Sequence, residues 1–166
     1  MRIEWMEKYL KEAEQMIYNQ NLEEGLGLLN KLLYEEPGYG SLHNHIGWAY
    51  CYYTEEAERA ERHLKLAAKF DPDYAAPYLH LGNLYTRLRR YGEALTWFEA
   101  GLNLSTANKT IMLEGMAKAY ELKMDYARAI SYYKRALAST LGAEVAALNE
   151  SIKRCRKKRF VLLFNF

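Results

Sequence analysis

The chain contains four histidines and two cysteines, the side chains that most often bind transition metals or transfer protons in proteins. His43 and His45 are two residues apart, so on a helix they point to nearly opposite sides and cannot bind the same ion. His45 and His80 would face each other if the chain repeats with a period of about 35 residues, and Cys51 lies on the same expected helix as His45. Zinc sites use closely spaced pairs of ligands, which these residues do not provide. We therefore predict no metal site.

The sequence also lacks a recognisable arrangement for acid–base or nucleophilic catalysis. Glu14, Glu114 and Glu121 fall on expected helices without an identifiable proton-transfer partner. The glycines are scattered one per helix or turn and form no phosphate-binding loop. We therefore predict that the protein is not an enzyme and needs no cofactor.

Length and composition favour an ordinary globular protein, because 166 residues with 50% apolar content suffice for a core. The N-terminal segment is charged throughout and lacks the apolar stretch of a secretory signal. The longest apolar run, residues 160–164, is far shorter than the roughly 20 residues that span a bilayer. Cys51 and Cys155 are too far apart for a disulfide framework or a zinc motif. We expect a cytoplasmic protein without a membrane span.

Charge is distributed unevenly along the chain. Drift of solvated surface charge is the simpler interpretation, and a field that orients a partner or favours head-to-tail contact is the alternative. The basic run at 153–159 is expected to form the solvent-facing side of the last helix; it lacks interleaved aromatic residues, so we expect no nucleic-acid binding. Counting Lys and Arg against Asp and Glu, residues 1–39 sum to −4, 40–73 to −2, 74–108 to +1, 109–143 to +3 and 144–166 to +4.

Three tyrosines, Tyr50, Tyr85 and Tyr120, stand 35 residues apart, and much of the surrounding sequence repeats with them. A fixed period of this length is typical of stacked supersecondary units. Because glycine inside a helix costs roughly 1 kcal/mol relative to alanine, a recurring glycine indicates that another helix approaches closely there. The repeated positions hold Gly47, Gly82 and Ala117; Ala60, Ala94 and Ala129; Leu64, Phe98 and Tyr133; and Ala67, Gly101 and Ala136.

This pattern resembles the tetratricopeptide repeat, whose unit is a helix–turn–helix of about 34 residues. The resemblance implies an all-α fold, an α-solenoid in which antiparallel helix pairs form a right-handed superhelix, with four repeats over residues 1–143. Residues 144–166 would form a capping helix and an apolar tail, with Val145, Leu148, Ile152 and Cys155 as its apolar stripe. The repeats are expected at about 6–39, 40–74, 75–109 and 110–143. First helices are expected at about 3–19, 40–53, 75–89 and 109–123, second helices at about 22–35, 56–70, 91–104 and 126–139, and a ninth helix from about residue 143.

In this family the first helices form a concave groove, so the resemblance also implies where a ligand would bind. Trp48 and Tyr52 are one helical turn apart and suit an apolar anchor; the alternative is that Trp48 packs against the next repeat. Some members clamp a C-terminal carboxylate with lysine, asparagine and arginine, but here those positions include Leu10 and Glu14, so we reject that mechanism. The predicted peptide-binding residues are Asn44, His45, Trp48, Tyr52, His80, Asn83, Arg87, Glu114 and Lys118.

The resemblance thus implies a non-enzymatic protein–protein interaction module that binds a peptide or partner segment in the groove. A secretion-type chaperone similar to the class II chaperones of type III secretion is one alternative. A structural subunit that self-assembles through its apolar tail is the other. We expect the tail, residues 160–166, to fold back on the repeats or to dock onto a second copy as a homo-oligomer, in preference to anchoring at a membrane interface.

Overall fold

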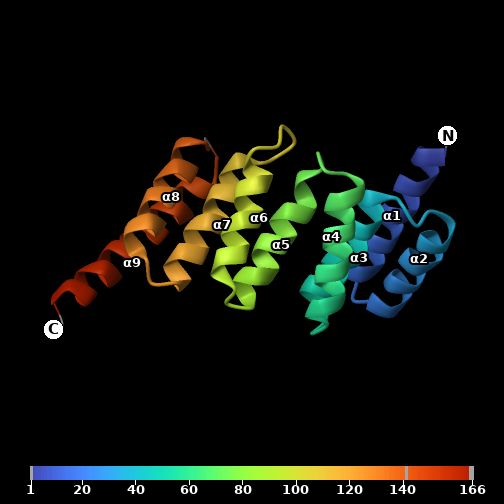
Figure 1. Ribbon diagram of the computed structural model, residues 1–166, viewed down its shortest axis with the longest axis horizontal. Helices are drawn as coiled ribbons and strands as arrows, with labels where there is room; N and C mark the ends of the chain where they lie inside the picture. Colours follow the sequence, from blue (N-terminus) through green and yellow to red (C-terminus); the bar gives the residue numbers. More distant parts are fainter. Residues whose placement is uncertain (1, 141, 165–166) are drawn as a thin grey trace. The chain divides into compact units, whose positions relative to one another are not determined.

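The computed structural model describes residues 2–140 and 142–164, and this part of the chain contains helices and turns but no strand (Figure 1). The helix bounds agree with the expected ranges to within two residues, which confirms the all-α prediction. The helices are α1 (Arg2–Tyr18), α2 (Leu22–Glu35), α3 (Gly40–Tyr53), α4 (Ala57–Phe70), α5 (Ala75–Arg87), α6 (Tyr91–Leu102), α7 (Lys109–Leu122), α8 (Tyr126–Ala138) and α9 (Glu144–Phe164).

Three of the four helix hairpins close through a residue with a left-handed backbone conformation. In each, the next amide donates a hydrogen bond back into the last turn of the first helix, a common way to end a helix. The turn of the second hairpin is also three residues long, and there the Thr54 hydroxyl donates to the Tyr50 carbonyl over 2.9 Å. The left-handed residues are Gln20, Arg89 and Met124, with φ of 69°, 59° and 64°.

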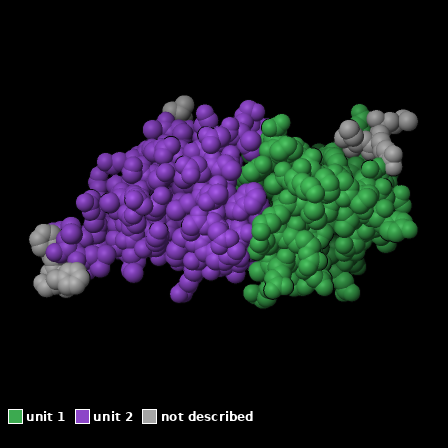
Figure 2. Space-filling model, viewed as in Figure 1, with its two compact units in different colours: residues 1–80 green, residues 81–166 purple. Residues whose placement is uncertain are grey.

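The chain forms two compact units, residues 1–80 and 81–166 (Figure 2). We call them the first unit and the second unit. The boundary lies within α5, so the first turns of that helix belong to the first unit and its remainder to the second. The repeat boundaries predicted from the sequence are a finer division of the chain and stay a prediction.

In the first unit, α3 packs closely against α4 where Gly47 meets Leu64. A methyl group at Gly47 would lie 2.6 Å from the Leu64 Cγ and 3.0 Å from its backbone nitrogen. Leu64 is fully buried, as are Leu42 and Ile46 on α3. The small–large pairing in the repeat pattern is therefore a contact between the two helices of one hairpin, and glycine permits it.

In the second unit, the same pairing encloses the ring of Phe98 on α6. A Cβ atom at Gly82 on α5 would lie 2.5 Å from the Phe98 Cε1, and one at Gly115 on α7 would lie 2.6 Å from the same atom. Phe98 has no exposed surface. The ring therefore lies against glycine on two different helices, and no larger residue fits at either position without displacing it.

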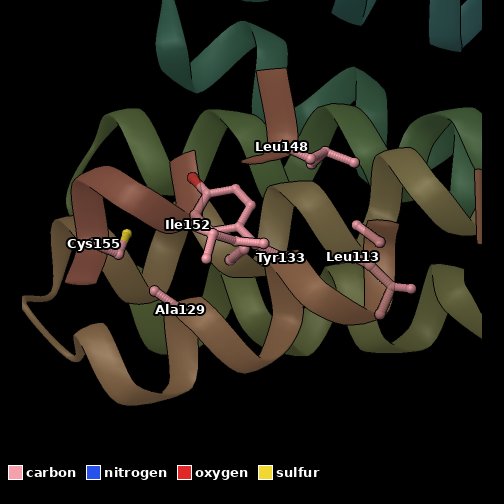
Figure 3. Close-up of a cluster of buried hydrophobic side chains, with 8 residues drawn as sticks. Leu113, Ala129, Tyr133, Leu148, Ile152 and Cys155 are labelled. Atoms are coloured by element: carbon pink, nitrogen blue, oxygen red, sulfur yellow. The ribbon is translucent and has the colours of Figure 1, made fainter. Parts of the chain in front are cut away.

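Helix α9 packs on α8 through a buried apolar stripe (Figure 3). Leu148, Ile152 and Cys155 are all buried and cluster with Tyr133 of α8. This confirms three of the four residues predicted for the stripe. The fourth, Val145, is 37% exposed, because the first turn of α9 is exposed along its whole circumference.

Glu121, near the end of α7, joins that helix to α9. Its buried carboxylate accepts two hydrogen bonds of 2.8 Å from the Arg154 guanidinium and one of 2.9 Å from the Lys158 ammonium. The Tyr133 hydroxyl donates a further bond of 3.1 Å. The expectation that the basic side of this helix meets only solvent is therefore wrong for Arg154 and Lys158, because a buried carboxylate requires cations beside it.

The four donors around Glu121 also determine its protonation. The hydrogen bonds from Arg154, with those from Lys158 and Tyr133, lower the pKa of Glu121 to about 2 against the opposing effect of burial. Burial, together with the neighbouring Glu121 carboxylate, raises the pKa of the Cys155 thiol to about 11. The carboxylate is therefore charged and the thiol protonated near neutral pH, which makes this a structural contact and leaves Cys155 unreactive.

The apolar segment after the basic run continues α9 as a helix through Phe164 (Figure 1). No glycine or proline interrupts the sequence between Gly142 and Phe164, so the helix continues through these residues. The expectation that this segment folds back on the repeats is therefore wrong for residues 160–163; residues 165–166 lie outside the described part. The exposed fractions are 61% for Phe160, 43% for Val161, 47% for Leu162 and 65% for Leu163.

Candidate functional site

The predicted peptide-binding residues divide between the two units. Five lie in the first unit and four in the second. In the first unit, Asn44, His45, Trp48 and Tyr52 lie on α3 and His80 on the first turns of α5; in the second, Asn83 and Arg87 lie on α5, and Glu114 and Lys118 on α7.

Trp48 is the centre of an aromatic cluster in the first unit. Its ring centroid lies 5.3 Å from that of Tyr18 on α1 and 5.1 Å from that of Tyr53 in the last turn of α3, both edge to face. The Tyr18 and Tyr53 centroids are 6.4 Å apart and complete a triangle. Trp48 is half-buried, whereas Tyr18 and Tyr53 are exposed. Trp48 thus packs against α1 of the preceding hairpin, a contact that the sequence did not predict.

Tyr52 pairs with His80, so Trp48 and Tyr52 contribute to two separate contacts. The Tyr52 hydroxyl lies 3.2 Å from the His80 Nδ1, with ring centroids 5.5 Å apart. Burial, with the proximity of His45, lowers the pKa of His80 to about 4. The His45 Nδ1 lies 2.8 Å from the Ser41 carbonyl and therefore carries a proton that it donates. Near neutral pH the Tyr52–His80 contact consequently presents a neutral imidazole.

Asn44 lies one turn before Trp48 on the same side of α3 and is only 5% exposed. Its amide nitrogen donates to the Tyr74 hydroxyl over 3.3 Å. Its carbonyl oxygen is buried and has no hydrogen-bond partner among the described residues. An unpaired buried acceptor costs on the order of 1–3 kcal/mol. The first unit therefore contains an unsatisfied acceptor on the side of α3 that carries Trp48.

Two carboxylates of α1 stand beside aromatic hydroxyls in the same unit. Glu7 accepts a hydrogen bond from the Tyr39 hydroxyl. Burial and the Glu14 carboxylate raise the pKa of Tyr18. Burial and, to a smaller extent, the Glu7 carboxylate likewise raise the pKa of Tyr74. Because Tyr18 packs on Trp48 and Tyr74 bonds Asn44, this side of the first unit combines aromatic rings with negative charge.

The four predicted residues of the second unit form two pairs. Asn83 and Arg87 are one turn apart on α5, and Glu114 and Lys118 are one turn apart on α7, so each pair shares one side of its helix. Arg87 and Lys118 are exposed, whereas Asn83 and Glu114 are half-buried. These positions give a surface of mixed charge, and their role in binding stays a prediction.

A second histidine pair joins α3 to α4. The His43 Nε2 lies 2.9 Å from the Pro37 carbonyl and therefore donates to it, and the His43 Nδ1 lies 3.1 Å from the His63 Nδ1. With His43 already a donor at Nε2, its Nδ1 accepts and the His63 Nδ1 donates. Burial, with the proximity of His43, lowers the pKa of His63 to about 4. The His63 ring is therefore neutral near neutral pH.

We expect this pair to make the protein sensitive to mild acid. The pKa of His63 is 6.5 when unperturbed and about 4 in the fold, so between these values the unfolded chain binds a proton that the folded chain does not. Stability is therefore complete above pH 6.5 and falls as the pH decreases toward 4. Because the ring is partly exposed, we expect a loss of about 1 kcal/mol from His63 by pH 5.

Urea unfolding at pH 7.5 and pH 5 tests this expectation. The free energy of unfolding should decrease from pH 7.5 to pH 5 in both proteins, and this decrease should be smaller by about 1 kcal/mol in His63→Gln than in the wild type. Lys65→Gln, an exposed change on the same helix, should show the wild-type decrease. An equal decrease in His63→Gln and the wild type would contradict the assignment.

Within residues 2–140 and 142–164, no group of three or more His, Cys, Asp or Glu side chains is arranged to hold a metal ion. Cys51, which the sequence placed on the same helix as His45, is a buried free thiol. The interactions of the histidines are hydrogen bonds and ring contacts.

The family follows from the helix hairpins together with their sequence. Residues 75–108 match one family model of the tetratricopeptide repeat, and residues 113–145 match a second. The first match spans the α5–α6 hairpin and the second spans most of α7 with α8. The fold is of the α-solenoid class, and the chain is a tetratricopeptide repeat protein. The protein is accordingly a protein–protein interaction module. The tetratricopeptide repeat fold is generally a non-catalytic scaffold.

Several solved structures share this fold at low sequence identity. PilF of Pseudomonas aeruginosa superimposes with a TM-score of 0.85 over 97% of this chain and 72% of its own, at 16% identity. PilW, a type IV pilus biogenesis factor, gives 0.76 over 92% and 74%, at 18% identity. The Cut9–Hcn1 hetero-tetramer gives 0.77 over 89% of this chain and 29% of that chain, at 22% identity. No curated protein sequence matches the chain.

Proposed function

We propose that the first unit binds a peptide or partner segment along the side of α1 and α3 that carries Trp48. The observation that carries this proposal is the aromatic cluster of Tyr18, Trp48 and Tyr53, whose half-buried tryptophan lies between two exposed tyrosines. Tryptophan and tyrosine provide much of the binding energy at protein interfaces, because they offer large, rigid apolar surfaces. An apolar side chain of the bound segment would pack against this cluster.

The polar atoms around the cluster determine what else the segment must offer. Glu7 and Glu14 on α1 favour a lysine or arginine in the segment over an acidic residue. The best ligand is therefore a segment with an apolar anchor and a neighbouring cation. This is the opposite of the carboxylate-clamp ligand that the sequence already argued against.

The remaining predicted residues extend this proposal. Tyr52 and the neutral His80 add hydrogen-bonding groups to the first unit, and His45 lies on the same helix as Tyr52. Further contacts are proposed for the second unit at Asn83, Arg87, Glu114 and Lys118.

The proposed activity is non-enzymatic, since the proposal gives the aromatic cluster and the neighbouring polar residues roles in binding and none in a reaction. We also propose that the protein acts in the cytoplasm. Cys51 and Cys155 are buried free thiols that belong to different units, which suits a reducing compartment.

Selection of peptides from a displayed random library tests the proposal, because such a selection requires no candidate partner. We expect the wild type to select peptides with a bulky apolar residue near a lysine or arginine. For the best peptide, Trp48→Ala should weaken binding about 30-fold or more, the loss of roughly 2 kcal/mol typical of a central aromatic residue. Fluorescence anisotropy with the labelled peptide measures this change.

Tyr34→Ala is the matched control, because Tyr34 is an aromatic residue of α2 that is 88% exposed and has no place in the site. It should bind the selected peptide like the wild type. Unchanged affinity in Trp48→Ala, with circular dichroism showing an intact fold, would exclude the first unit as the binding site.

A further inference from the structure

We propose that the C-terminal end of α9 docks on an anionic lipid surface. The observation behind this proposal is the arrangement of two kinds of residue on one exposed helix end. Phe160–Leu163 are all at least 43% exposed, and they follow directly on six basic residues between 153 and 159. A helix end that is apolar, exposed and preceded by cations has the properties of an interfacial anchor.

The apolar surface surrounds the helix on all sides. Successive helical residues are rotated by about 100°, so Phe160 to Leu163 together cover nearly the full circumference. A groove on another protein would cover one side of such a helix and leave the other in water. The boundary between lipid headgroups and acyl chains would cover all sides at once.

The dimensions of this end also fit. Residues 160–164 rise about 7 Å along the helix axis, within the depth of roughly 5–10 Å at which interfacial helices insert. None of the helices in the described part of the chain has the length and apolarity to cross a membrane. The proposal therefore concerns attachment to one surface of a bilayer.

The cations next to the apolar end are only partly used by the fold. Arg154 and Lys158 hold Glu121, and Lys153 pairs with Glu150. Arg156, Lys157 and Arg159 are exposed, and the described residues offer them no ion pair. Between residues 151 and 163 there is no acidic side chain. Three uncommitted cations thus stand within about two helical turns of the apolar end, where the phosphates of anionic lipids would lie.

The Glu121 contact fixes this end before it meets a surface. Arg154 and Lys158 bind α9 to α7 through the last turns before residue 160, and Cys155 is fully buried beneath them. The apolar end is therefore a preformed extension of a packed helix. Less conformational entropy is lost on binding than for a segment that must fold at the surface.

Vesicle sedimentation tests the proposal. With vesicles of phosphatidylcholine containing about 30% phosphatidylglycerol, we expect the partition coefficient of the wild-type chain to be at least tenfold higher than with phosphatidylcholine alone. The preference should decrease as salt rises from 0.1 to 0.5 M, because the attraction is electrostatic. Equal partition into both vesicles, or none into either, would overturn the proposal.

Matched variants separate the two contributions. Leu162→Glu with Leu163→Glu should lower partition into the anionic vesicles at least tenfold, and Arg156→Glu with Arg159→Glu should abolish the preference for them. The control, Lys123→Glu with Lys134→Glu, makes the same change of net charge at exposed lysines of the second unit and should have a much smaller effect. If the control lost as much partition into the anionic vesicles as Arg156→Glu with Arg159→Glu, net charge alone would explain the binding and the docking site would be refuted.

Two further measurements distinguish lipid docking from self-association and from binding at the peptide site. Light scattering should give the same mass for the wild type and for Leu162→Glu with Leu163→Glu. If the wild type instead forms a larger assembly that the substitutions dissociate, and it does not bind vesicles, the apolar end contacts a second copy and lipid docking is refuted. Trp48→Ala should partition into vesicles like the wild type, because the lipid contact does not use the peptide site.

Discussion

Replacement of Phe98 by alanine should lower the free energy of unfolding of the second unit by about 3–5 kcal/mol. Phe98 has no exposed surface, and its ring lies against Gly82 on α5 and Gly115 on α7. Because neither glycine has a side chain that can move into the vacated space, the cavity would persist, which places the cost in the upper part of the range for such substitutions. Guanidinium unfolding followed by circular dichroism measures the loss.

Phe160→Ala is the matched control, since the same atoms are removed in the same unit from a side chain that is 61% exposed. It should change the free energy of unfolding by less than about 0.5 kcal/mol. A loss below about 1 kcal/mol in Phe98→Ala would show that the space around the ring collapses and that the two glycines do not define it.

The contact between the ring and the glycines can be tested in the opposite direction. Gly82→Ala places a methyl group 2.5 Å from the ring and should destabilise the fold, although alanine is the better helix former. In a Phe98→Leu background the same change should cost less, because the smaller side chain leaves room. A coupling of at least about 1 kcal/mol between the two positions is the expected result of this double-mutant cycle.

These positions show how much of the fold can be predicted from the sequence. The repeated small residues indicated where helices approach one another, and the structure confirms the close packing at Gly47 and Gly82. Gly115 could not be predicted in the same way. It occupies the position that holds His45 and His80 in the two preceding repeats, so the repeat pattern gives no reason to expect a glycine there.

The candidate site was predictable only in outline. The spacing of the repeats placed Asn44 and Trp48 on one side of α3; in the structure Asn44 is buried and Trp48 half-buried, and their role in binding stays a prediction. Whether Trp48 contacts Tyr52 or Tyr53 depends on side-chain rotamers and on the approach of α1, which spacing does not encode. The unsatisfied oxygen of Asn44 likewise results from its exact surroundings in three dimensions, since an exposed asparagine would have the same sequence context.

The contact between Glu121 and α9 joins residues more than 30 positions apart, and the sequence contains only one indication of it. Arg154 and Lys158 are one turn apart on α9, as two cations that bind a single carboxylate must be. Nothing in their spacing identifies which carboxylate they bind. The requirement that a buried charge be paired becomes informative only when the burial of Glu121 is known.

Glu121→Gln should lower the free energy of unfolding by about 2–3 kcal/mol and detach α9 before the rest of the second unit unfolds. The substitution preserves the size of the side chain but removes the charge that Arg154 and Lys158 share. Removing one partner of a buried ion pair typically costs about 3–5 kcal/mol, and we expect less here because both cations are nearly half exposed and recover hydration. Hydrogen exchange should show lost protection concentrated in α9.

The pH dependence provides an independent test of the same contact. The pKa of Glu121 is about 2 in the fold and 4.5 when unperturbed, so the folded state keeps the carboxylate charged where the unfolded chain protonates it. The stabilisation by Glu121 is therefore complete above pH 4.5 and is lost as the pH falls toward 2, a range below that in which His63 acts. The difference between the wild type and Glu121→Gln should accordingly be constant above pH 5 and decrease below it.

Glu114→Gln, a change of the same kind at a half-buried position of α7, is the matched control and should cost less than about 0.5 kcal/mol. Glu121→Leu combined with Arg154→Leu should recover part of the stability lost in Glu121→Gln, because an apolar pair needs no compensating charge. If Glu121→Gln unfolds like the wild type, with α9 equally protected, then the apolar stripe of Leu148, Ile152 and Cys155 alone holds that helix and the ion pairs add nothing.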